Sequence, residues 1–136
     1  ILATNVRGPF AVVRAMLPML RKSERAVVVN ISSIASVTAN GSNVIYCASK
    51  AALDNMTKSL ARALAPRIRV LAVSPGLVDT EFIANLDEQW RNEQVAKTPL
   101  KSLATPRHVA EAVVAATLLS FTTGAVIPVD GGRPLS

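Results

Sequence analysis

The sequence predicts an α/β fold in which helices cover both faces of a parallel sheet. Short runs rich in β-branched residues alternate with longer segments of helical period along the chain. The strand-like runs lack the polar alternation of a half-exposed strand, and the segments between them are long enough for right-handed crossover helices. These observations favour a doubly wound sheet, in which ligands bind outside the carboxyl ends of the strands.

In the first half of the chain we expect two helices and one strand. Residues 5–20 carry apolar side chains at nearly helical spacing, although Pro9 and Pro18 should bend or shorten this helix. Residues 26–31 are mostly β-branched and predict a central strand that is buried on both faces. After a loop rich in serine, glycine and asparagine, an apolar stripe over residues 44–64 predicts a long helix that ends before a proline.

The second half continues the alternation. Residues 68–73 predict a second strand, which the following Ser-Pro-Gly sequence ends. Residues 80–102 are charged with scattered apolar positions, and we interpret them as short helices and loops that form a lid over the ligand. The Thr-Pro pair at 105–106 is an N-cap and a first helical residue, so a third helix begins there. The final strand, 125–129, contains Pro128 and is expected at an edge of the sheet.

The composition excludes several classes of protein. With 136 residues the chain forms at most one domain, and half of its residues are hydrophobic, which is enough for a packed core. The single cysteine, Cys47, and the single histidine, His108, exclude an internal disulfide and a zinc cluster, so we expect no metal site. No apolar run is long enough to cross a bilayer and no signal-peptide pattern is present, so we expect no membrane partner and a cytoplasmic location.

The net charge of +6 suits nucleic acid, an anionic membrane or an acidic partner, and charge by itself does not choose among them. The basic residues are scattered along the chain rather than gathered in one stripe. Only 4% of the residues are aromatic, which argues against stacking on bases. We therefore expect no nucleic-acid partner.

Tyr46 and Lys50 are the residues best suited to chemistry at the carboxyl edge of the sheet. They are four positions apart at the start of the long predicted helix, so they lie one turn apart on the same face. Acid–base catalysis near neutral pH requires the pKa of a tyrosine to fall by ~2–3 units, and a lysine charge about 5 Å away supplies most of that fall in a partly dry site. The same spacing is also common on ordinary helix surfaces. Ser33, just beyond the first strand, adds a hydroxyl that can orient a carbonyl group.

Five motifs occur in order along the chain. They are Thr4-Asn5-Val6-Arg7-Gly8, Asn30-Ile31-Ser32-Ser33, Tyr46-Cys47-Ala48-Ser49-Lys50, Ser74-Pro75-Gly76-Leu77-Val78-Asp79-Thr80, and Thr123-Gly124 with Asp130-Gly131-Gly132. Their conjunction resembles the classical short-chain dehydrogenase/reductase family over essentially the whole chain, with similarity to 3-oxoacyl carrier protein reductases and to sugar and polyol dehydrogenases. The resemblance implies a Rossmann-like doubly wound parallel sheet, of which residues 1–136 form the C-terminal catalytic part with about three strands.

The resemblance also implies roles for individual residues. Tyr46 would be the general acid/base, Lys50 would assist it and hold the ribose of a nicotinamide cofactor, and Ser33 would orient the substrate. Asn5 would kink its helix and hold a water that links the lysine to solvent. The residues implied to bind NAD or NADP are Tyr46, Lys50, Pro75, Gly76, Val78 and Thr80. The implied reaction is hydride transfer between that cofactor and a carbonyl compound or secondary alcohol, in a homo-oligomer that is a dimer or a homotetramer.

The chain lacks three elements of the family pattern, which are a glycine-rich turn after the first strand, an acidic or basic selector after the second strand and an Asn-Asn-Ala-Gly-like segment before the first helix seen here. None of its glycines forms the G-x-G-x-x-G turn that receives the pyrophosphate of a dinucleotide, and the residue that selects NAD or NADP is absent. The chain begins at Ile1 without an initiator methionine, so we interpret it as lacking an N-terminal nucleotide-binding part and expect it to bind a dinucleotide weakly by itself. The sequence at Ser120-Phe121 is also several residues shorter than in related chains, either because the link is truly shortened or because residues are missing from this sequence.

Two alternatives to an enzyme stay open at this point. A non-catalytic oligomerisation or binding module derived from the family would keep the helix over residues 44–64, which in the family pairs across a subunit interface, without using a cofactor. A nucleic-acid-binding domain ranks below the oxidoreductase and the non-catalytic module. Its affinity for nucleic acid would fall steeply as the salt concentration rises.

Overall fold

Three parallel strands form the sheet in residues 1–85 and 87–135, which the computed structural model describes. The strands are β1 (Val27–Ile31), β2 (Arg69–Pro75) and β3 (Val126–Val129), and their order across the sheet is β1-β2-β3. Their bounds differ by one or two residues from the predicted 26–31, 68–73 and 125–129. The parallel arrangement confirms the predicted α/β fold class.

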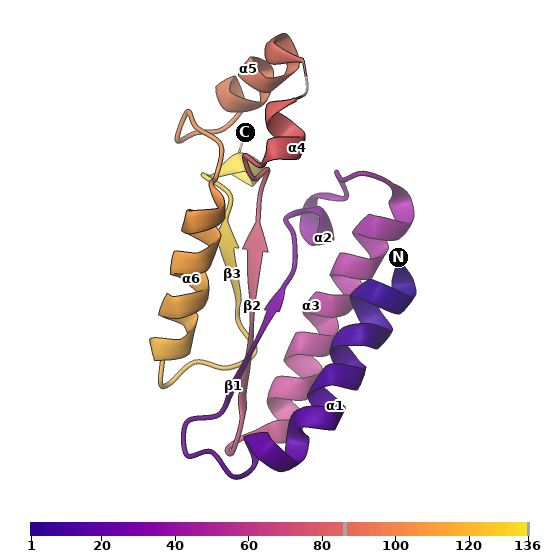
Figure 1. The fold of residues 1–136 in the computed structure, drawn as a ribbon, viewed down its shortest axis with the longest axis vertical. Helices are drawn as coiled ribbons and strands as arrows, with labels where there is room; N and C mark the ends of the chain where they lie inside the picture. The colour runs from indigo at the N-terminus through magenta and orange to yellow at the C-terminus, as the bar shows by residue number, and fades with distance from the viewer. Residues whose placement is uncertain (86, 136) are drawn as a thin grey trace.

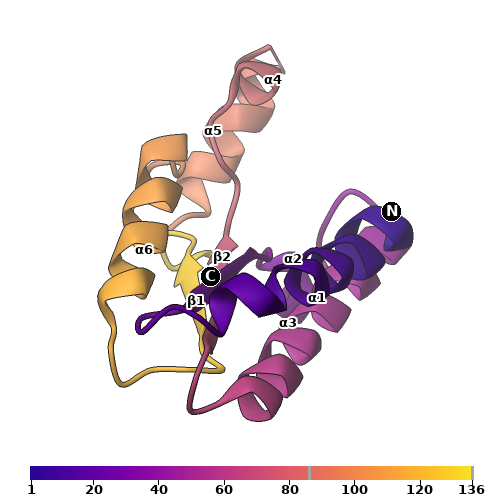
Figure 2. The ribbon, with the colours of Figure 1, turned by 60° about the horizontal axis from the view of Figure 1, so that its bottom comes forward.

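Helices cover both faces of this sheet. On one face α1 (Gly8–Leu20) and α3 (Val44–Leu64) run side by side, and α6 (Pro106–Leu118) lies on the other face (Figure 1). In the turned view, the strands again separate α6 from α1 and α3 (Figure 2). The bounds of α3 are those predicted from its apolar stripe. Within the part of the chain that the structure describes, no helix combines the length and apolarity needed to cross a membrane.

The centre of the packed core is β2. Its residues Val70, Leu71, Ala72 and Val73 are 0% exposed, because β2 has a strand on each side and helices on each face. The register places Val73 opposite one residue of β1 and one of β3, so the three strands end at the same edge of the sheet. That edge holds the carboxyl ends, where a parallel sheet opens to ligands.

The two outer strands are only partly buried. Among the described residues β1 has β2 as its sole strand neighbour, so the prediction of a central strand is wrong for this sheet, and Ile31 is 45% exposed. The β-branched run reflects helices above and below the strand and carries no information on how many strands lie beside it. At the opposite edge β3 places Pro128 beside Ser74, as predicted for a strand that contains proline.

The first predicted helix, residues 5–20, has two parts. It starts with η1 (Ala3–Arg7), a π-helical turn, and continues as α1. Pro9 is the second residue of α1 and Pro18 lies inside its last turns, and neither proline ends the helix, which continues directly from η1. The departure from ideal geometry is therefore at the start of the helix rather than at Pro18.

Capping residues fix the starts of the other two long helices. The side chain of Asn43 accepts a hydrogen bond from the N–H of Tyr46 at 2.8 Å and so begins α3. At α6, Thr105 and His108 each accept a hydrogen bond from the other's main-chain N–H, which forms a capping box. The single histidine is thus an exposed capping residue.

Shorter helices lie near the carboxyl edge of the sheet. They are α2 (Ala35–Thr38), α4 (Glu81–Ala84), α5 (Glu88–Ala96) and the 3-10 turn η2 (Arg133–Leu135). Helices α4 and α5 agree with the short helices predicted within residues 80–102. In the segment predicted as a loop, α2 forms a single turn, at whose start the Ser33 hydroxyl accepts a hydrogen bond from the Ala35 N–H at 3.2 Å.

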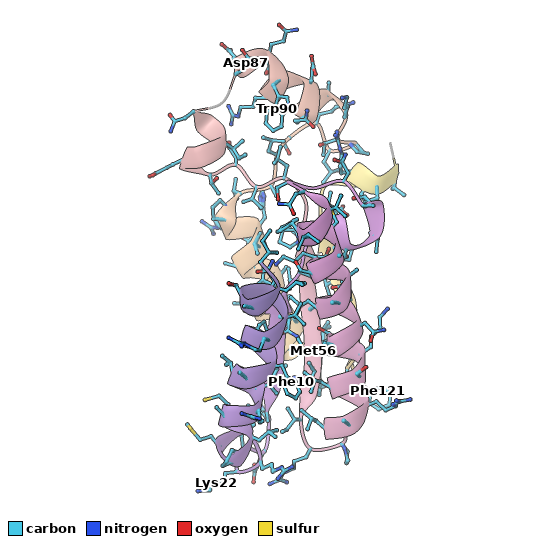
Figure 3. All side chains as sticks on the ribbon, turned by 90° about the vertical axis from the view of Figure 1, so that its right-hand side faces the viewer. Phe10, Lys22, Met56, Asp87, Trp90 and Phe121 are labelled. Atoms are coloured by element: carbon cyan, nitrogen blue, oxygen red, sulfur yellow. The ribbon has the colours of Figure 1, made fainter. Side chains whose placement is uncertain are left out.

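Arg69 ties the short connection between α6 and β3 to the start of β2. Its guanidinium donates to the carbonyl oxygens of Thr117 and Leu119, each at 2.8 Å. The last carbonyls of a helix have no intrahelical donor, so the guanidinium satisfies groups that would otherwise depend on solvent. Phe121, in the same connection, is fully exposed and points away from the protein (Figure 3).

We expect Arg69→Ala to lower the free energy of unfolding by about 1–2 kcal/mol, because several carbonyls lose a charged donor at once. Urea unfolding followed by circular dichroism measures this change. Arg67→Ala is the matched control, since Arg67 makes a single exposed hydrogen bond, to the carbonyl of Arg21. Equal losses in the two variants would show that Arg69 does not hold the end of α6.

Candidate active site

The candidate site lies where the three strands end. A cavity of about 1360 Å³ opens there and is lined by residues from several elements. The segment after β1 contributes Ser33, and the first turn of α3 contributes Tyr46. The turns after β2 and β3 contribute Gly76 and Asp130. Segments far apart in the sequence therefore meet around one space.

Tyr46 and Lys50 are held together at the start of α3. The ammonium of Lys50 lies 5.7 Å from the centroid of the Tyr46 ring, as their spacing of one helical turn predicts. The same ammonium donates a hydrogen bond to the carbonyl oxygen of Ile31, the last residue of β1, at 2.9 Å. This bond fixes the lysine between the helix and the end of the strand, behind the tyrosine that lines the cavity.

The environment of Lys50 acts on its charge in two opposite ways. Partial burial lowers the pKa of the Lys50 ammonium below its ordinary value, because the charged form loses hydration. The carboxylate of Asp54, one turn further along α3, opposes that effect and raises the pKa of Lys50. Burial is the larger of the two, so the lysine releases its proton more readily than an exposed lysine would.

Asn5 reaches the main chain of Tyr46 through Ser49. The Asn5 amide donates to the Ser49 hydroxyl at 3.0 Å, and that hydroxyl donates to the carbonyl oxygen of Tyr46 at 2.7 Å. Ser49 is completely buried, so the link is shielded from solvent. Asn5 itself lies in the π-helical turn η1, a type of turn that often marks functional sites.

Ser33 lies on the wall of the cavity that Tyr46 also lines. Its oxygen accepts a hydrogen bond from the Ala35 N–H, and its own proton remains available to a ligand. The preceding residue, Ser32, is 3% exposed, and its main-chain N–H donates a hydrogen bond to the carbonyl of Val73 at 2.7 Å. The end of β1 is thus anchored to β2 directly before the serine that faces the cavity.

The segment after β2 is held on both sides. Gly76 donates its N–H to the carbonyl of Val129 at 2.9 Å, and a Cβ on Gly76 would lie only 3.0 Å from the Cα of Asp130. Two residues further on, Val78 forms an isolated parallel bridge with Ala104. The two hydrogen bonds of this bridge use the carbonyl of residue 77 and the N–H of residue 79, so the N–H and carbonyl of Val78 itself are directed away from Ala104.

Of the six expected cofactor residues, the structure brings two to the wall of the cavity and leaves four outside that wall. Tyr46 and Gly76 line the cavity. Lys50 lies behind Tyr46, and Pro75 is the buried last residue of β2. Val78 follows on the same segment, and Thr80 precedes α4 with an exposed hydroxyl that makes no capping hydrogen bond.

One side of the cavity is formed by Trp90 and Gln94 of α5. The segment that follows α5 adds Lys97, Thr98 and Ser102. The Trp90 side chain points back toward the rest of the protein, whereas Asp87 lies at the outer tip (Figure 3). An ion pair between Arg91 and Asp79 connects α5 to the segment after β2.

The C-terminal segment also holds α5. The guanidinium of Arg133 donates to the side-chain oxygen of Gln94 at 2.9 Å. Both residues line the cavity, and neither is part of a sequence motif. The two positions are 39 residues apart, so no local pattern could have predicted this contact. Across residues 1–85 and 87–135, no group of three or more histidine, cysteine or acidic side chains is arranged to hold a metal ion.

Comparison with known proteins identifies the family. A family model described as Enoyl-(Acyl carrier protein) reductase matches residues 1–133. A short-chain dehydrogenase/reductase homolog of Bacillus subtilis is 38% identical over 130 residues, which cover 96% of this chain and 100% of that protein. The chain belongs to the short-chain dehydrogenase/reductase family. The 3-oxoacyl-[acyl-carrier-protein] reductase of Thermotoga maritima is 36% identical over 135 residues, which cover 97% of this chain and 55% of the enzyme.

Solved structures agree with this assignment. The ligand-free aldohexose dehydrogenase of Thermoplasma acidophilum is similar with a TM-score of 0.92 at 30% identity, over 100% of this chain and 58% of that one. The protein ElxO, solved with NADP bound, is similar with a TM-score of 0.87 at 26% identity, over 97% of this chain and 56% of its own. The chain thus spans about half the length of the Thermotoga reductase, the Thermoplasma dehydrogenase and ElxO, and the full length of the Bacillus homolog. The predicted resemblance and the Rossmann-like fold are confirmed.

Gly131 stands where the turn after β3 approaches the segment after α5. Its φ is +62°, and a Cβ there would lie 2.6 Å from the Cγ2 of Thr98. We expect Gly131→Ala to destabilise the protein by about 1–3 kcal/mol, through an unfavourable backbone conformation and this close contact.

Chemical denaturation measures the effect of Gly131→Ala. The control is Gly8→Ala, since a Cβ on Gly8 makes ordinary contact at 3.4 Å with a carbonyl oxygen, and alanine favours a helix. That control should be neutral or stabilising. If Gly131→Ala is as stable as the control, the close approach at Thr98 does not constrain the turn.

Proposed function

We propose that the protein containing this chain is a nicotinamide-dependent oxidoreductase. It transfers a hydride between NAD or NADP and a carbonyl compound or secondary alcohol, with Tyr46 as general acid/base. The observation that carries the proposal is the placement of the Lys50 ammonium, 5.7 Å from the Tyr46 ring at the wall of a cavity. The names of the relatives, a 3-oxoacyl-[acyl-carrier-protein] reductase and an aldohexose dehydrogenase, support the same reaction class.

The residues after β2 fit a nicotinamide group. The N–H and carbonyl of Val78 do not take part in the bridge to Ala104, and together they match the donor and acceptor of a carboxamide. Thr80 adds an exposed hydroxyl within the same segment. When bound, the nicotinamide supplies or accepts the hydride, and the protein supplies orientation and proton transfer. The NADP-bound structure of ElxO supports a cofactor of this class.

Proton transfer falls to Tyr46, whose hydroxyl gives a proton to the oxygen of the carbonyl substrate or takes one from the alcohol. Lys50 is placed to stabilise the negative charge on the tyrosine oxygen when its proton leaves. Ser33 still has its own proton to donate, so it can hold the substrate oxygen beside Tyr46. Each of these groups comes from a rigid helix or from the end of a strand.

Asn5 completes the proposed catalytic set as a positioning group. Its amide nitrogen is engaged by Ser49, and no described residue donates a hydrogen bond to its amide oxygen. This oxygen is free to accept from a water that carries protons between Lys50 and solvent. The bond to Ser49 keeps Asn5 beside the turn of α3 that holds Tyr46.

The segment 80–102 is proposed as a lid over the substrate. Trp90 lines the cavity from α5 and offers an aromatic face to the apolar part of a small substrate. The ion pair of Arg91 with Asp79 and the bond of Arg133 to Gln94 hold α5 in place over the cavity.

The proposal includes a cytoplasmic location for the reaction.

A homo-oligomer, a dimer or a homotetramer, belongs to the same proposal. Apolar side chains are exposed on outer helix faces, with Val12 and Met19 of α1 at 62% and 65% and Leu118 of α6 at 75%. Such side chains are suited to contact with another subunit. The same observation favours a second candidate, a non-catalytic oligomerisation module, which would keep these faces and bind no cofactor.

Tyr46→Phe in the whole protein tests the catalytic assignment, because it removes only the hydroxyl. We expect kcat for reduction of a carbonyl substrate to fall at least about 100-fold with the fold intact. Cys47→Ala is the matched control at the neighbouring position, and it should retain activity. Near-normal turnover by a folded Tyr46→Phe variant would exclude Tyr46 as the acid/base.

Cofactor binding separates the enzyme from the non-catalytic module. Titration with NADH and NADPH is followed by nicotinamide fluorescence, for this chain and for a longer version that includes a glycine-rich βα unit. We expect tight binding by the longer version alone, because residues 1–136 contain no glycine-rich pyrophosphate turn. Absence of binding in both would favour the non-catalytic module.

A further inference from the structure

Asp54 is a buried carboxylate that local packing does not explain. It is 7% exposed, and no described residue forms a hydrogen bond with its Oδ1 atom, which is itself buried. Burying a carboxylate oxygen without a donor is strongly unfavourable unless a positive charge nearby compensates. The residue is therefore a candidate for an electrostatic role.

The position of Asp54 on α3 points it toward the end of β1. Residues 50, 54 and 57 share one face of the helix, at spacings of four and three. Both neighbours on that face contact β1, since Lys50 donates to the Ile31 carbonyl and Thr57 accepts from the Asn30 side chain at 2.8 Å. Asp54 lies between these two contacts.

Lys50 is the positive charge that can compensate the carboxylate of Asp54 where α3 packs against β1. On α3 itself, Lys58 and Arg62 are exposed. On the neighbouring elements η1 and α1, Arg7 and Arg14 are also exposed. From β2, the Arg69 guanidinium is bound to carbonyls at the end of α6. Neither β1 nor α2 contains a titratable residue, and the remaining titratable groups on this side of α3 are Tyr46 and Cys47.

We propose that Asp54 is a positioning residue that keeps Lys50 protonated beside Tyr46. For its catalytic consequence the proposal rests on the proposed function. The spacing along the helix makes the effect selective. Asp54 is one turn from Lys50 but two turns, about 12 Å of helix rise, from Tyr46, so its negative charge acts on the lysine far more than on the tyrosine.

The experiment measures the charge state of Lys50 directly. In the whole protein with isotope-labelled lysine, NMR follows each lysine side chain as the pH rises, and Lys50→Arg identifies the signal of Lys50. In Asp54→Asn we expect the titration midpoint of Lys50 to fall by about one unit, as for a unit charge removed from about 6 Å away at an intermediate dielectric constant. Asp54→Glu, which keeps the charge, should retain most of the original midpoint.

Two controls separate this effect from a general one. Glu24→Gln removes one negative charge from an exposed site and should leave the Lys50 midpoint unchanged. Asp54→Leu removes the charge and also the cost of burying it, so it provides a second uncharged variant if Asp54→Asn does not fold. An unshifted Lys50 midpoint in a folded uncharged variant would overturn the proposal.

The pH profile of kcat/KM connects Lys50 to the reaction. In Asp54→Asn the loss of activity at high pH should begin about one unit lower, in step with the NMR midpoint. If the Lys50 midpoint falls in Asp54→Asn while Tyr46→Phe keeps full activity, the effect of Asp54 on Lys50 is supported and the proposed reaction is rejected. A lower kcat with both midpoint and profile unchanged would show that Asp54 is merely structural, and would overturn the proposal.

Discussion

Main-chain hydrogen bonds run from β2 to a strand on each side while helices cover both of its faces, so the position of β2 decides where the other elements end. Its register sets the ends of β1 and β3 level with its own. The residues that leave these ends, Ser33, Gly76 and Asp130, then meet around one cavity. A shift of one residue in either register would move a wall of the cavity by more than 3 Å.

Directional bonds between α3 and its neighbours add what apolar packing cannot supply. Leu53 and Ala61 bury the helix against the sheet, but buried apolar contacts tolerate small rotations about the helix axis. The bonds from Lys50 to the end of β1 and from Asn30 to Thr57 allow only one rotation. The direction of Tyr46 is therefore set by polar groups that lie beneath it, outside the cavity.

The sequence alone predicted what depends on local chemistry. The apolar stripe and the proline that follows it predicted the bounds of α3, and a spacing of four predicted the contact of Lys50 with Tyr46. Contacts between distant segments left no such signal, for example Asn5 with Ser49, 44 positions apart. Asp54 did leave one, as an acidic residue on the same helix face as Lys50. The position of β1 in the sheet could not be predicted, because a buried strand has the same composition at a centre or an edge.

The outer edge of β1 can pair with an extended segment of another polypeptide. Within the described residues its N–H and carbonyl groups on that side face no partner strand, and its residues are mostly valine and isoleucine. Natural sheets protect such edges with lysine, proline or a bulge, none of which occurs within β1. An uncovered edge of this kind is a template on which any extended apolar segment can add as a further strand. A strand that paired with this edge would therefore protect the protein against aggregation as well as extend the sheet.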